Sequence, residues 1–197
     1  MKQAISILII SLFLLASAIG QQKSQESLTR YSPEKCGLSL ELPSQPESMN
    51  APVPEEMRNM IYYMTMHISM SNGLVVVMNH ASASTEMPAK SIAEGVVKGI
   101  IKSAGVSDLQ YKTEPSTNTK APLKGSYKQQ NVVLEINGIA LSQKTHSWGV
   151  VMVYKQTDKA AQAQAQRILD SIKIDGVPCS DLKDQIGLLQ SKWTGIE

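Results

Sequence analysis

The sequence predicts an α+β fold, in which helices pack on a mainly antiparallel sheet as an α/β/α sandwich. Two Asn-Gly dipeptides, Asn72-Gly73 and Asn137-Gly138, lie between strand-like runs. Asn-Gly is typical of two-residue hairpin turns because both central positions need positive φ, and hairpins imply antiparallel pairing. Two segments, 85–105 and 157–172, place apolar residues at helical spacing. Hairpin-linked strands interrupted by such helices are typical of α+β proteins.

The first 20 residues have the three parts of a secretory signal peptide. Lys2 gives a basic start, residues 4–15 are almost wholly apolar, and Ala16, Ala18 and Gly20 supply small residues at the positions that a signal peptidase reads. The apolar run is short for a membrane-spanning helix, which needs about 20 residues. We therefore expect a secreted or periplasmic protein with no stable membrane anchor after cleavage, and a mature chain that begins near Ile19 or Gln21.

The charge of the mature chain argues against a nucleic-acid partner. Removing residues 1–20 lowers the count of Lys and Arg from 19 to 18, because Lys2 is lost, against 17 Asp and Glu. The net charge is then 18 minus 17, or about +1, and no basic stripe is present. The long-range field that attracts nucleic acid is therefore missing.

The mature chain divides into a polar N-terminal tether at 21–35, an α+β domain at 36–176 and a C-terminal helical extension at 177–197. The domain opens with "CGLSLEL", in which Cys36, Leu38, Leu40 and Leu42 share one face, as in a half-buried strand. Four prolines then predict a surface loop over residues 43–56.

The stretch "MTMHISMSNGLVVVMNH", residues 64–80, predicts a hairpin that turns at Asn72-Gly73 and places His67 opposite Met78. One face carries Met64, Met66, Ile68, Met70, Val75 and Val77. The other face carries Thr65, His67, Ser69, Val76, Met78 and His80. We predict that the first face, with its methionines, is buried against the 85–105 helix near Ile92, Val96 and Ile100.

The later elements follow from the same patterns. Gly105 suits the end of the first helix, and close packing on the sheet would explain Gly95 and Gly99 inside it. Strand-like runs are expected at 109–113, 121–130 and 148–155, with a second hairpin turning at Asn137-Gly138. Thr157 is the expected cap of the second helix, with Ala161, Ala165, Ile168, Leu169 and Ile172 inward. A last amphipathic helix is expected at 182–193.

Two cysteines, Cys36 and Cys179, remain in the mature chain. In an oxidising compartment an even pair indicates one disulfide, and no Cys-x-x-Cys spacing points to redox or metal chemistry. Closing so long a loop would stabilise the fold by about 4–5 kcal/mol in the chain-entropy model.

The order of elements resembles the PsbP-like family of secreted or lumenal α/β/α sandwich domains. The resemblance lies in "GLSLELPSQPE", "GSYKQQNVVLEINGIALSQKTHSWGVVMVYK" and "AQRILDSIKI", and covers about Cys36 to Ile174. It implies a binding or accessory role, since the family's namesake is an extrinsic subunit of photosystem II that helps to retain inorganic ions. No ligand motif of that family is present to carry over.

The chemistry-bearing residues allow three functions. The sequence favours a non-enzymatic binding or accessory domain that takes an unknown protein or small ligand and needs no cofactor, because no catalytic or phosphate-binding motif occurs. The alternative is a copper-type metal site of His67, Met78 and His80, which share one face of the hairpin. An uncharacterised hydrolase is a weaker alternative. His146 is expected in a turn, and Trp148 is expected to pack in the core.

Overall fold

The computed structural model describes residues 27–34, 36–50, 53, 58–106 and 108–182. The predicted signal peptide and nearly all of the predicted helix at 182–193 lie outside these residues. Among the described residues, no helix is long and apolar enough to span a membrane.

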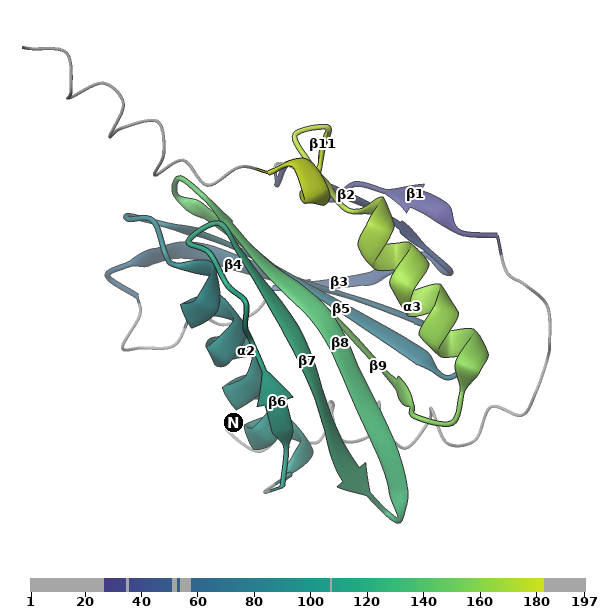
Figure 1. Ribbon diagram of the computed structural model, residues 1–197. Helices are drawn as coiled ribbons and strands as arrows, with labels where there is room; N and C mark the ends of the chain where they lie inside the picture. The colour runs from purple at the N-terminus through teal and green to yellow at the C-terminus, as the bar shows by residue number, and fades with distance from the viewer. Residues whose placement is uncertain (1–26, 35, 51–52, 54–57, 107, 183–197) are drawn as a thin grey trace, which may run out of the picture.

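The main body is a seven-stranded antiparallel sheet with the strand order β3-β4-β5-β9-β8-β7-β6 (Figure 1). Its strands are β3 (Glu47–Asn50), β4 (Ile61–Ser71), β5 (Leu74–Ala83), β6 (Gln110–Lys112), β7 (Lys120–Gln129), β8 (Val132–Gln143) and β9 (His146–Lys155). The predicted antiparallel α+β class is confirmed at this level.

A smaller antiparallel sheet has the order β1-β2-β10-β11. It consists of β1 (Thr29–Tyr31), β2 (Leu38–Leu42), β10 (Lys173–Ile174) and β11 (Val177–Pro178), followed by the 3-10 turn η2 (Cys179–Asp181). Strand β1 therefore lies within the segment expected to be a tether. It pairs with the predicted entry strand, whose three leucines are buried.

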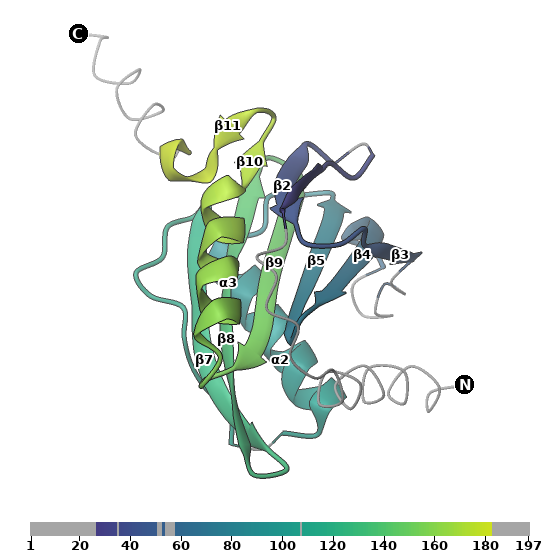
Figure 2. The same ribbon diagram turned by 90° about the vertical axis from the view of Figure 1, so that its right-hand side faces the viewer.

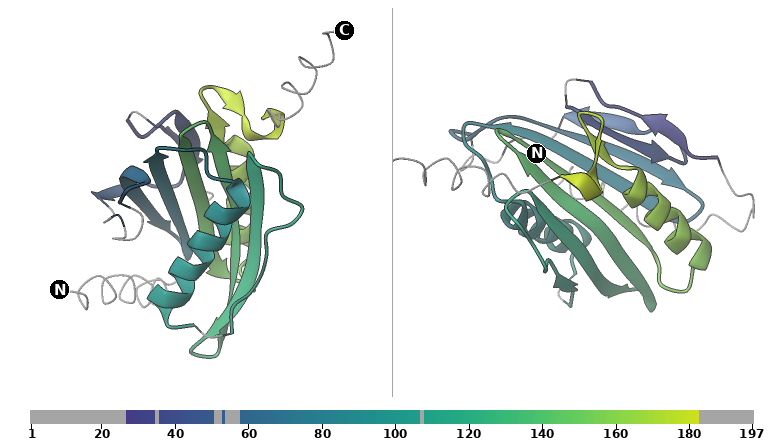
Figure 3. Two further views of the ribbon diagram at one scale, coloured as in Figure 1. Left: turned by 90° about the vertical axis from the view of Figure 1, so that its left-hand side faces the viewer. Right: turned by 45° about the horizontal axis from the view of Figure 1, so that its top comes forward.

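Two helices lie on opposite sides of the large sheet (Figure 2). Helix α2 (Ala89–Ala104) packs on β7, β8 and β9, whereas α3 (Lys159–Ser171) packs on β2, β8 and β9. Strand β9 contacts both helices because its successive side chains point to opposite faces of the sheet. Val151 and Val153 face α2, while Val150 and Met152 face α3 and the small sheet. Figure 3 shows the same separation from two further sides.

The helix ends follow their local chemistry. Gly105 ends α2 in the left-handed conformation, with φ of 64°, as predicted. The cap of α3 is Asp158, not Thr157, because the Asp158 carboxylate accepts a 3.0 Å hydrogen bond from the backbone nitrogen of Ala161. The predicted inward residues Ala161, Ala165, Ile168 and Ile172 are buried.

The first predicted hairpin is confirmed, and the second is wrong. Asn72 and Gly73 turn with φ of 45° and 81°, and His67 lies opposite Met78. In contrast, β8 runs straight through Asn137 and Gly138. A Cβ atom at Gly138 would lie 2.5 Å from the backbone oxygen of Val150, so this glycine permits close approach of β9.

The predicted burial of the three methionines is also wrong, although Ile68 and Val75 on the same face are buried. Met70 is 39% exposed, and Met64 and Met66 are only half-buried. The reason is the position of α2, which covers β7, β8 and β9 but not β4. The opposite face of the hairpin is buried more completely, and its Met78 is 1% exposed in the core beneath β2 and α3.

The predicted Cys36–Cys179 disulfide is wrong as well, because both thiols are free and buried. Cys36 adjoins Gly37, which lies beside Asp175 at the turn of the β10–β11 hairpin. Cys179 lies at the open end of that hairpin, where its nitrogen donates to Ile172. Three to four strand residues span about 10–13 Å, whereas a disulfide needs Cα atoms within about 7 Å.

Candidate functional site

The three histidines of the chain lie on one face of the large sheet. They come from neighbouring strands: His67 from β4, His80 from β5 and His146 from β9. The register explains the grouping, because His80 pairs with both Thr65 and Trp148, while His67 and His146 lie two pairs further along in opposite directions. Alternation then turns all three side chains to the side that also carries the small sheet.

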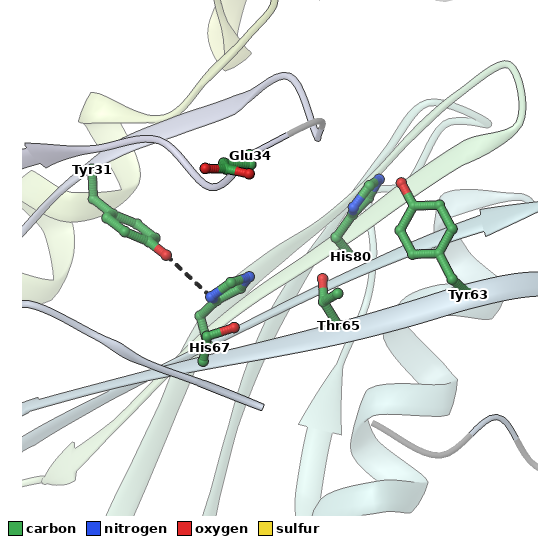
Figure 4. A pocket seen from close by; sticks show the side chains of 7 residues that line it. Tyr31, Glu34, Tyr63, Thr65, His67 and His80 are labelled. Carbon is green, nitrogen blue, oxygen red and sulfur yellow. Dashed lines mark hydrogen bonds between the residues drawn. The ribbon is translucent and has the colours of Figure 1, made fainter. Parts of the chain in front are cut away.

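A cleft of about 530 Å³ opens over this face (Figure 4). The residues that line it are Tyr31, Glu34, Ser48, Tyr63, Thr65, His67 and His80. They come from β1, the segment after it, β3, β4 and β5. Docking of the small sheet on the large one therefore forms the cleft, since Tyr31 and Glu34 belong to one side and the histidines to the other.

His67 is held by Tyr31. Its Nδ1 lies 3.1 Å from the Tyr31 hydroxyl, and the two rings meet edge to face at 5.8 Å. His67 is buried, and burial lowers its pKa while it raises the pKa of Tyr31. Both groups are therefore neutral at neutral pH, and Tyr31 can donate its proton to Nδ1.

His80 belongs to an aromatic group with His146, Trp148 and Tyr63. Its Nε2 lies 3.0 Å from Nδ1 of His146, and its ring is nearly parallel to the indole of Trp148 at 5.7 Å. Tyr63 meets the His80 ring edge to face at 5.3 Å. Burial, followed by repulsion from His146 and then His67, lowers the pKa of His80 to about 4.

The described residues that line the cleft include one residue with a formal charge, Glu34, and no Lys or Arg is among them. Burial raises the pKa of Tyr63, so its hydroxyl stays protonated as well. The remaining lining groups are neutral hydroxyls and imidazoles, each of which can both donate and accept hydrogen bonds.

The predicted metal set is only partly brought together. His67 and His80 both line the cleft, but Met78 lies in the core between them and is not among the lining residues. Within the described part of the chain, no group of three or more His, Cys, Asp or Glu side chains is arranged to hold a metal ion.

Among the described residues of the cleft, no serine or threonine hydroxyl is hydrogen-bonded to a histidine. Ser48 and Thr65 share the cleft with both histidines, but the hydrogen bonds of the imidazoles go to Tyr31 and His146. A serine or threonine nucleophile of the hydrolase alternative needs a hydrogen bond to its base.

Sequence reasoning missed five residues of this region. Ser48 fell in the predicted surface loop at 43–56 but belongs to β3. Tyr31 and Glu34 fell in the predicted tether, Tyr63 was not singled out, and His146 was expected in a turn but is the first residue of β9. Alternation in "HSWG" could have placed His146 on the face of Trp148. Trp148 is 3% exposed and packs in the core, as predicted, and its indole nitrogen donates to the Cys36 carbonyl at 2.7 Å.

The comparisons with known proteins give little. No family model matches the chain, and no curated protein matches it. Among solved structures the chain is similar to LpqN, described as involved in cell envelope biogenesis of Mycobacterium tuberculosis. The two share 13% sequence identity over 75% of this chain and 91% of LpqN, with a TM-score of 0.37. A likeness of that degree carries no assignment.

Proposed function

We propose that this chain is a secreted or periplasmic accessory domain, without enzymatic activity, that binds a small polar ligand between its two sheets. The cleft itself is the observation that carries the proposal. Polar groups from both sheets converge on a volume of about 530 Å³, which lies in the range typical of small-molecule sites.

Two sequence features support the exported, accessory part of the proposal. The first 20 residues have the pattern of a signal peptide, and the later elements resemble PsbP-like domains. The α/β/α sandwich belongs to the same proposal, and it is supported by α2 and α3, which lie on opposite faces of the large sheet.

A fragment screen by NMR tests the proposed site. A ¹⁵N-labelled protein is mixed in turn with uncharged, cationic and anionic fragments, and we expect some to shift the signals of Thr65, His67 and His80. Thr65→Trp should abolish these shifts because the indole fills the cleft. Ser48→Trp, at an exposed position of β3, should also weaken these shifts, and it tests the site if the Thr65→Trp variant does not fold.

The matched control is Val133→Trp, at an exposed position of β8 outside the cleft lining. It should bind the same fragments as the wild type. The proposal is wrong if no fragment shifts the cleft signals, or if fragments bind the Thr65→Trp variant unchanged while it melts normally.

Copper-type metal binding is a second candidate, and the His80–His146 contact favours it. The two facing nitrogens are 3.0 Å apart, so a soft cation could take both imidazoles as ligands if the shared proton leaves and the rings move about 1 Å apart, because metal–imidazole bonds are about 2 Å long. Titration with Cu(I) should then show one bound ion that His146→Phe removes. Unchanged binding in that variant would exclude the pair as the site.

A further inference from the structure

We infer that the cleft selects neutral polyhydroxylated ligands of mono- to disaccharide size and discriminates against anions. This inference rests on the proposed function and names the ligand class of the same site. The argument has three steps: the charge of the lining, its hydrogen-bonding repertoire, and the placement of its aromatic rings.

The charge of the residues that line the cleft disfavours anionic ligands. A buried phosphate or carboxylate needs a cationic or charge-assisted partner, and none of the described residues that line the cleft is Lys or Arg. Glu34, which lies over the row of histidines in Figure 4, would repel an anion instead. Protonated imidazoles could replace the missing cations, but burial keeps both His67 and His80 neutral at neutral pH.

The hydrogen-bonding groups match hydroxyls. Tyr31, Ser48, Tyr63 and Thr65 present hydroxyl groups, which donate and accept. The Nε2 of His67 is opposite the nitrogen that contacts Tyr31, and a neutral imidazole offers one donor and one acceptor. A sugar hydroxyl also donates one hydrogen bond and accepts others. A ligand that has only acceptor atoms would leave the acceptor atoms of the cleft without partners.

The two tyrosines stand at opposite ends of the cleft, with His67, Thr65 and His80 between them (Figure 4). Tyr63 is 38% exposed, so part of its ring is available to a ligand. An aromatic ring offers an apolar surface to the C–H groups of a sugar ring while its hydroxyl remains in the polar network. The carboxylate of Glu34 adds an acceptor that can bind two hydroxyls at once.

A matched ligand series tests the inference at pH 7. The probes are glucose, galactose, mannose, N-acetylglucosamine, maltose and cellobiose, together with the three uronates and glucosamine. We expect at least one neutral sugar to shift the Thr65 and His67 signals, and its uronate to bind about tenfold more weakly. Glu34→Gln should reduce the difference in affinity between the neutral sugar and its uronate. The control Glu86→Gln, at an exposed position outside the cleft, should leave that difference unchanged.

The outcomes separate the two proposals. Uronates that bind as tightly as the neutral sugars overturn the inference. A screen in which other fragments shift the cleft signals, but none of the neutral sugars does, also overturns it and leaves the binding cleft standing. If no fragment and no sugar shifts the NMR signals of the cleft residues, both the proposed function and this inference are wrong.

Discussion

His80 is a titratable side chain that the fold holds almost out of contact with solvent. It is 2% exposed, it stacks on Trp148, and its Nε2 faces His146. An unfolded histidine binds a proton near pH 6.5, whereas His80 in the fold does so near pH 4. The unfolded chain therefore binds more protons than the folded chain between these values, and acid favours unfolding.

The first prediction concerns this pH dependence. The contribution of His80 to the free energy of unfolding should be fully present above pH 6.5 and be lost as the pH falls to about 4. The loss should amount to about 2–3 kcal/mol. Urea denaturation at a series of pH values measures it. His80→Phe, which keeps an aromatic ring beside Trp148, should flatten the profile, while the control Val133→Thr should retain it. Parallel profiles for wild type and His80→Phe would contradict the assignment.

At the scale of the element, the β4–β5 hairpin shows that methionines on its two faces have different environments. Met78 lies in the core beneath β2 and α3, and Met70 is 39% exposed on the other face. We predict that Met78→Ala lowers the free energy of unfolding by about 2–5 kcal/mol, and Met70→Ala by less than about 1 kcal/mol. Chemical denaturation of the two variants compares them directly. Equal decreases in the free energy of unfolding for the two variants would contradict the burial of Met78 and the exposure of Met70.

The glycines of β8 and α2 make a second matched pair. A Cβ at Gly138 would collide with the backbone of β9, whereas a Cβ at Gly99, on the exposed side of α2, would meet nothing within 4 Å. Gly138→Ala should therefore cost about 1–3 kcal/mol, and Gly99→Ala should stabilise the protein by about 0.5–1 kcal/mol. Thermal unfolding of the two variants measures both changes in stability, which should have opposite signs. The expected close packing of Gly95 and Gly99 on the sheet is wrong for the same reason, since both point to open space.

At the scale of the whole molecule, Trp148 joins the two sheets. It belongs to β9 of the large sheet, and its indole nitrogen donates to the carbonyl of Cys36, next to β2 of the small sheet. Both residues lie in one core cluster that includes strands of both sheets and α3. The two sheets should therefore unfold together.

Trp148→Phe tests this connection. It leaves the buried Cys36 carbonyl without its donor and should cost about 1–3 kcal/mol, while a single transition persists by far-UV circular dichroism and tyrosine fluorescence. The control Tyr62→Phe, at a side chain that is 71% exposed, should change stability by less than about 0.5 kcal/mol. Two separated transitions in the wild type would show that the sheets are independent units.

The sequence by itself determined the features that depend on neighbours along the chain. The Asn72-Gly73 turn, the end of α2 at Gly105 and the buried face of α3 each follow from a few consecutive residues. Their physical cause is local, since backbone conformation at a turn or helix end is set by the residues that form it. The pairing of His67 with Met78 followed from the same turn.

The tertiary structure alone decided which face of the hairpin is buried and where the cleft lies. Alternation favoured the face that carries Met64, Met66 and Met70, but the positions of α2, α3 and β2 bury Met78 on the other face and leave Met70 exposed. The cleft joins Tyr31 and Glu34 to His67 and His80 across two sheets. No local pattern encodes that contact, because it exists only once the small sheet docks on the large one and excludes water between them.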